Sequence, residues 1–251
     1  MISVMLLTLL GIEPFIQDRG ERSYFFGNHT INITQISTIG MQILWKGQTY
    51  CSLITQRNKQ DQIRIAIDPF NQDTGLRPPS LEADIALITH EEADNIKILK
   101  GDPFVVSGPG EYEIRGVFIQ GIACSREKEE GSNTIYTIEA ENMRLCHLGV
   151  FSAKELTPEQ VEKIGNVDIL FVPVGGGNTI AAKEAAKIVG QIEPRIVIPM
   201  MYAIPKLKMK LAKVDEFLKT MGKRAVEPQA KIILRERDLG GEETKVMVVT
   251  P

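Results

Sequence analysis

The order of secondary-structure signals along residues 41–251 constrains the fold of this chain more than any other feature. Short runs rich in apolar and β-forming residues, separated by turn formers, come first, and strands alternating with helices follow. No linker or shift of composition separates these two halves, so the pattern predicts one α/β domain. The predicted strands are 41–46, 49–55, 63–68, 85–88, 104–106, 112–122, 133–140, 143–148, 168–174, 195–199, 231–236 and 244–250.

Three helices are predicted in the second half of the chain. The first begins after Thr157, where a hydroxyl cap, a proline at the first helical position and a glutamine at the third form a capping box. The second covers 181–192, with apolar residues at helical spacing, and the third covers 206–221. These helices should pack on the strands that precede and follow them.

Composition limits the classes of partner. The chain has 251 residues, 43% of them hydrophobic, which is enough for a sizeable core, and its net charge is -3. That charge gives no general reason to expect nucleic acid or an anionic membrane. The lysine stripe of Lys206, Lys210 and Lys213 is interpreted as a solvated face. We therefore expect no nucleic-acid or membrane partner, and leave a small-molecule ligand and a homo-oligomer open.

Cysteine usage and the N-terminus indicate the compartment. Cys51, Cys124 and Cys146 are odd in number and share no C-x-x-C spacing, which is typical of reduced thiols. The apolar residues 1–10 lack a basic region and a cleavage site, and they are too few to cross a bilayer. A cytoplasmic protein is expected.

A polar loop follows the short apolar run at 85–88. It places His90, Glu92 and Asp94 at alternate positions, which share a face in an extended segment. An imidazole and two carboxylates that converge at the end of a strand can bind a metal ion. The alternative interpretation is a solvated acidic loop.

This loop resembles the H-x-H-x-D-H loop of the metallo-β-lactamase fold, which follows a strand that commonly reads D-x-x-L-x-T-H. The nearest branch is that of zinc-dependent hydrolases related to the ascorbate phosphate lactonases. Further matches are Asp68-Pro69-Phe70, Gly110-Glu111-Tyr112-Glu113, Val172-Pro173-Val174-Gly175-Gly176, Glu184-Ala185 and Ile198-Pro199-Met200-Met201-Tyr202. The resemblance implies an αββα sandwich over residues 41–251. We hypothesise that residues 1–40 are an N-terminal appendage, with an upstream start codon as one origin.

The resemblance also assigns metal-ligand positions, and most of them are changed. The positions of the first metal are His90, Glu92 and His147. Those of the second metal and the bridging aspartate, together with a rim histidine, are Asp94, Asn95, Met201, Val150 and Gln48. Valine has no lone pair, and a thioether suits zinc poorly beside oxygen ligands. A binuclear centre is therefore not expected.

One arrangement survives these changes. His90, Glu92 and His147 could hold one divalent metal, zinc, iron or manganese, with open coordination positions. Such a metal would polarise a carbonyl or phosphoryl oxygen and activate water, with Asp94 as the candidate catalytic proton acceptor. The alternative is no metal, with both histidines kept as hydrogen-bonded pocket residues.

The functional prediction is a hydrolase-like protein whose binuclear site is degraded and which has little or no hydrolase activity. The rival prediction is a non-catalytic binding or scaffold protein that uses the inherited pocket or an oligomer surface.

Overall fold

The computed structural model describes residues 14–17, 21–26, 29–32, 40–58, 61–91, 95–125, 131–241 and 243–251. The chain divides into two compact units, Met1–Thr38 and Ile39–Pro251. In the first unit, an antiparallel sheet that was not predicted contains β1 (Pro14–Gln17), β2 (Glu21–Phe26) and β3 (His29–Asn32). The origin of the first forty residues stays a prediction.

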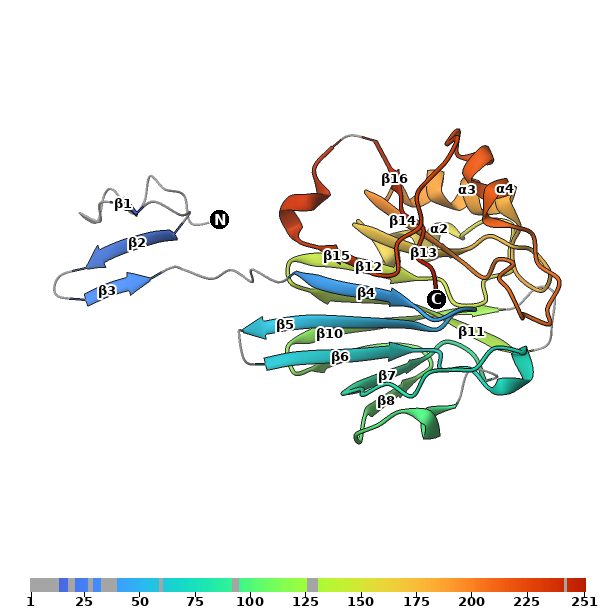
Figure 1. Ribbon diagram of the computed structural model, residues 1–251, viewed down its shortest axis with the longest axis horizontal. Coiled ribbons are helices and arrows are strands. Elements are labelled where there is room, and N and C mark those ends of the chain that lie inside the picture. Colours follow the sequence, from blue (N-terminus) through green and yellow to red (C-terminus); the bar gives the residue numbers. More distant parts are fainter. Residues whose placement is uncertain are drawn as a thin grey trace. The chain divides into compact units, whose positions relative to one another are not determined.

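The second unit is built on two facing sheets (Figure 1). The six-stranded sheet has the order β15-β4-β5-β6-β7-β8. Its strands are β4 (Met41–Trp45), β5 (Cys51–Asn58), β6 (Asp61–Ile67), β7 (Ile85–Ile88), β8 (Phe104–Ser107) and β15 (Ile232–Leu234). The seven-stranded sheet has the order β16-β14-β13-β12-β11-β10-β9. Its strands are β9 (Gly110–Ile114), β10 (Val117–Ser125), β11 (Ser132–Ala140), β12 (Met143–His147), β13 (Ile169–Pro173), β14 (Ile196–Met200) and β16 (Lys245–Val246).

The main core lies between the two sheets. Alternate residues of β4 point into this core and are buried. Apolar side chains of the seven-stranded sheet are buried in the same core. Trp45, Ile65, Ile138 and Phe171 are examples from four different strands. Burial of this much apolar surface is the main force that holds the sheets together.

Helices cover the outer face of the seven-stranded sheet (Figure 1). They are α2 (Pro158–Ile164), α3 (Ala182–Ile192) and α4 (Val214–Thr220). On the other outer face, loops and the short turns η1 (Gln72–Thr74) and η3 (Ile96–Ile98) cover a second apolar cluster around Ala66 and Ala86. The prediction of the αββα sandwich of the metallo-β-lactamase fold is confirmed. Among the described residues, α-helices form one outer layer, and loops with short turns form the other.

Two predicted elements were wrong. The predicted strand 112–122 is a hairpin, because Arg115 and Gly116 both have positive φ and form a two-residue turn. The third predicted helix begins only at Val214. Before it, Lys206 has a φ of 70° and the backbone N–H of Ala203 is bonded to the carbonyl of Ala212, so this segment is an irregular loop.

The predicted capping box is confirmed. Thr157 and Gln160 form both hydrogen bonds of a capping box, and proline occupies the start of α2. Cys51, Cys124 and Cys146 are buried and form no disulfide with one another. Among the helices of the described residues, none has the length and apolar character needed to span a membrane.

Candidate metal centre

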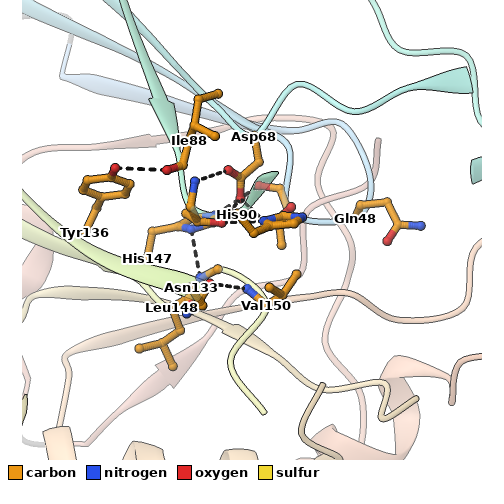
Figure 2. Close-up of polar contacts among 12 residues, drawn as sticks. Gln48, Asp68, Ile88, His90, Asn133, Tyr136, His147, Leu148 and Val150 are labelled. Atoms are coloured by element: carbon orange, nitrogen blue, oxygen red, sulfur yellow. Dashed lines mark hydrogen bonds and ion pairs between the residues drawn. The ribbon is translucent and has the colours of Figure 1, made fainter. Parts of the chain in front are cut away.

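The candidate site lies where three strands end. Asp68 follows β6, His90 follows β7, and His147 is the last residue of β12 (Figure 2). Strands β6 and β7 are parallel, so their carboxyl ends meet at the same edge of the six-stranded sheet. This topology brings the two family-like motifs, which are separate in the sequence, to one place.

Asp68 organises the first half of the site. Its side chain is fully buried, and it accepts the backbone N–H of Thr89 at 2.7 Å and the Thr89 hydroxyl at 2.6 Å. Because that hydroxyl donates to the carboxylate, its oxygen acts as the acceptor toward His90 Nδ1, which lies 2.7 Å away. His90 Nδ1 therefore carries the hydrogen, and it also lies 3.7 Å from Asp68 Oδ2.

This chain of hydrogen bonds fixes the tautomer of His90. With the hydrogen on Nδ1, the neutral ring keeps its lone pair on Nε2. No hydrogen bond from Nε2 to the described residues is present. An imidazole that is oriented through Nδ1 and open at Nε2 is suited to bind a metal or a ligand donor.

His147 has the opposite character. It is fully buried, its Nε2 donates to the carbonyl of Thr49 at 3.1 Å, and its Nδ1 accepts the backbone N–H of Gly149 at 3.2 Å. Burial lowers the pKa of His147 to about 4, an effect that the nearby carboxylate of Asp68 opposes. The ring is therefore neutral, and both of its nitrogens are used in hydrogen bonds.

Val150, the position that the resemblance assigns to the bridging aspartate, lies in a loop whose backbone is held by the side chain of Asn133. The Val150 N–H donates to Asn133 Oδ1 at 3.0 Å, and Asn133 Nδ2 donates to the carbonyl of Leu148 at 2.9 Å (Figure 2). Gly149 has a φ of 61°, and a Cβ there would lie 2.3 Å from Asn133 Oδ1. Buried Asn133 thus closes this loop without a metal.

Asn95 and Met201, two positions that the resemblance assigns to the second metal, donate hydrogen bonds to backbone carbonyls. Asn95 Nδ2 donates to the carbonyl of Phe70 at 2.9 Å. Met201 is buried, and its N–H donates to the carbonyl of Gln48 at 3.3 Å. The Gln48 side chain points away from His90 and His147, and its buried Nε2 has no partner among the described residues (Figure 2).

Comparison with known proteins identifies the family. The family described as beta-lactamase superfamily domain matches residues 42–201. The chain belongs to the beta-lactamase superfamily.

Individual relatives agree with this family. A relative from Thermococcus onnurineus is 31% identical over 199 residues, which cover 64% of this chain and 86% of the relative. One from Pyrococcus furiosus is 30% identical over 210 residues, which cover 74% and 93%. A solved Thermotoga maritima structure of the metallo-beta-lactamase superfamily is 34% identical with a TM-score of 0.69, covering 83% of this chain and 98% of that chain. The family prediction is confirmed.

The described residues do not fit the metal centre that this superfamily implies. No group of three or more His, Cys, Asp or Glu side chains among them is placed to hold a metal ion. Of the two histidines at the site, His90 alone keeps a ring nitrogen without a hydrogen bond to a described residue, because both nitrogens of His147 are occupied. Glu92 and Asp94 lie outside the described residues, so their roles as metal ligand and proton acceptor stay predictions.

Sequence reasoning missed three residues that shape this site. Asp68 stands in a motif that was recognised, but its hydrogen bond to Thr89 was not foreseen. Asn133 and Thr49 carried no motif at all, because their roles depend on contacts across the fold. The sequence marked Asn133 only as a polar residue at the start of a predicted strand. Its burial, which implies hydrogen-bond partners, is visible only in the structure.

Proposed function

We propose that this beta-lactamase superfamily protein has lost the binuclear metal centre, binds at most one divalent metal, and has little or no hydrolase activity. The Thermococcus onnurineus relative is named a metal-dependent hydrolase, which supports a hydrolytic ancestry for this chain. The observation that carries the proposal is the hydrogen bonding of His147, whose two ring nitrogens are both occupied within the protein.

The changed positions support the same proposal. A second metal needs ligands with available lone pairs and a bridging carboxylate to offset the repulsion between two dications. Val150 has neither a lone pair nor a carboxylate, and the side-chain amide of Asn95 is hydrogen-bonded to the carbonyl of Phe70. Met201 brings a soft thioether to a site that would otherwise have oxygen and nitrogen ligands.

Elemental analysis of protein purified without chelator, with zinc, iron and manganese supplied, tests the metal content. We expect no more than one equivalent per chain, and two equivalents would overturn the proposal. If one metal is bound, a nitrogen of His147 must first give up its hydrogen bond to Thr49 or Gly149. In that case His147→Ala should abolish metal binding, whereas Asp94→Asn should weaken it much less, since Asp94 is placed outside the ligand set. One equivalent that survives His147→Ala would show that the ligand assignment is wrong.

Hydrolysis assays test the activity. Turnover of lactone, β-lactam and phosphodiester substrates should stay close to background with zinc added, and robust zinc-dependent turnover would contradict the proposal. The variant Glu92→His, Asn95→His, Val150→Asp, Met201→His should gain zinc binding if the scaffold is intact. Adding His90→Ala to that variant is the control, and it should remove most of the gain.

A second candidate function is non-catalytic binding of a small molecule. A pocket lined by Asn95 and by two cationic side chains, Arg77 and Lys97, favours it. In this proposal the protein is cytoplasmic, in keeping with three cysteines that form no disulfide, and its partners are a small molecule or a second copy rather than nucleic acid or a membrane.

A further inference from the structure

A pocket of about 530 Å³ is lined by residues of the segment that follows β6 and by Asn95, one of the positions that the resemblance assigns to the second metal. Arg77, Lys97, Gln72 and Asn95 are among its lining residues. Asn95 joins the pocket to that segment, because its backbone N–H and its side-chain amide donate to the carbonyls of residues 69 and 70. The volume suits a small molecule.

The charged residues among the described lining of this pocket are both cations. Arg77 and Lys97 come from two different loops, both are exposed, and neither has a hydrogen bond or ion pair with any other described residue. No carboxylate is among the described lining residues. Two unpaired cations in a concave site raise the local concentration of anions.

A lysine-rich loop extends this positive field. Lys206, Lys208 and Lys210 are exposed, and residues 194–214 contain no aspartate or glutamate. The loop is fixed against the turn η1, because the N–H of Lys208 donates to the carbonyl of Thr74 at 2.9 Å. This contact places the lysine loop next to the turn η1, whose first residue, Gln72, lines the pocket.

We propose that this pocket binds a small anion that carries a phosphate or carboxylate group. The planar guanidinium of Arg77 supplies paired N–H donors that match such a group, and Lys97 supplies a point charge. Lys206, Lys208 and Lys210 attract the anion toward the pocket. The proposal deepens the binding candidate of the proposed function and requires no metal.

Calorimetric titration of the metal-stripped protein with inorganic pyrophosphate and with citrate tests this site and distinguishes the two groups. The variant Arg77→Gln, Lys97→Gln should bind the preferred anion about tenfold more weakly. Lys219→Gln, Arg224→Gln is the matched control, with the same change of charge at exposed residues of another surface, and it should stay within about twofold of the parent. Arg77→Lys separates charge from geometry and should lose about fivefold.

The lysine loop should affect anion binding only through its positive electrostatic field, without direct contact with the anion. Lys206→Gln, Lys208→Gln, Lys210→Gln should weaken binding about threefold and reduce the dependence of affinity on salt. The proposal is overturned if the parent binds neither anion at millimolar concentration, or if the control loses as much affinity as the pocket variant. Tighter binding of a single-stranded oligonucleotide that depends on the lysine loop would also overturn it. Because the protein is metal-stripped, these outcomes do not depend on the metal content that tests the proposed function.

Discussion

His90 and His147 occupy family-like positions in the same site, yet their surroundings differ completely. His147 is fully buried and uses both ring nitrogens to join two backbone segments. His90 is held through Nδ1 by Thr89 and leaves Nε2 open. A histidine that persists in a family motif can therefore serve packing rather than chemistry, and its hydrogen bonds decide which.

Removal of His147 should have the largest effect. His147→Ala leaves the Thr49 carbonyl and the Gly149 N–H without partners and creates a cavity, so we expect a loss of about 3 kcal/mol in the free energy of unfolding. For a chain of this size that lowers Tm by about 6–12 °C. His90→Ala is the control and should cost less than about 1 kcal/mol. Equal losses in metal-free protein would remove the contrast between the two histidines.

Acidification should reveal the same burial. The pKa of His147 in the folded protein is about 4, below the ordinary histidine value, so the unfolded state binds more protons between these values. The contribution of His147 to the free energy of unfolding is complete above the pKa that histidine has in the unfolded chain. It is lost as pH falls, and we expect the free energy of unfolding to drop by about 2 kcal/mol between about pH 7 and pH 5. Urea unfolding across that range measures it. His147→Asn should show a flatter dependence, and an unchanged slope would count against a buried neutral imidazole.

Asp68→Asn should switch the tautomer of His90 while reducing the stability of the protein only moderately. An amide donor in place of the carboxylate lets the Thr89 hydroxyl accept from Asn and donate to His90 Nδ1, which moves the ring hydrogen to Nε2. Nitrogen NMR of the imidazole would report this change of tautomer. The free energy of unfolding should fall by about 1–2 kcal/mol. Thr89→Val is the control, because it breaks the relay and provides no donor to Nδ1.

Chelation should have the smallest effect. The loop at Val150 is held by its hydrogen bonds to the side chains of Asn133 and His147, so treatment with EDTA should shift Tm by less than about 1 °C. A fall of several degrees, reversed by zinc, would show that a metal braces this loop in place of those hydrogen bonds.

The accuracy of the sequence predictions follows the range of the interactions involved. The capping box at Thr157 was predicted because its partners are three residues apart. The helix at 206–221 was mostly wrong, because tertiary contacts of the loop at Lys208 and Ala212 outweighed its helical periodicity. The hairpin at Arg115 was missed since arginine gives no turn signal, although its φ is positive.

The strand and helix pattern of the sequence predicted one α/β domain, and the resemblance implied the two-sheet sandwich and the family. Side-chain chemistry alone gave the further point that Val150 has no donor atom and Met201 offers only a soft thioether. Only the tertiary structure decided that His147 is saturated and His90 is open. The partner of His147 Nε2, the carbonyl of Thr49, is 98 positions away in the sequence. Such backbone carbonyls leave no mark in the sequence, so the availability of a lone pair is a property of the fold.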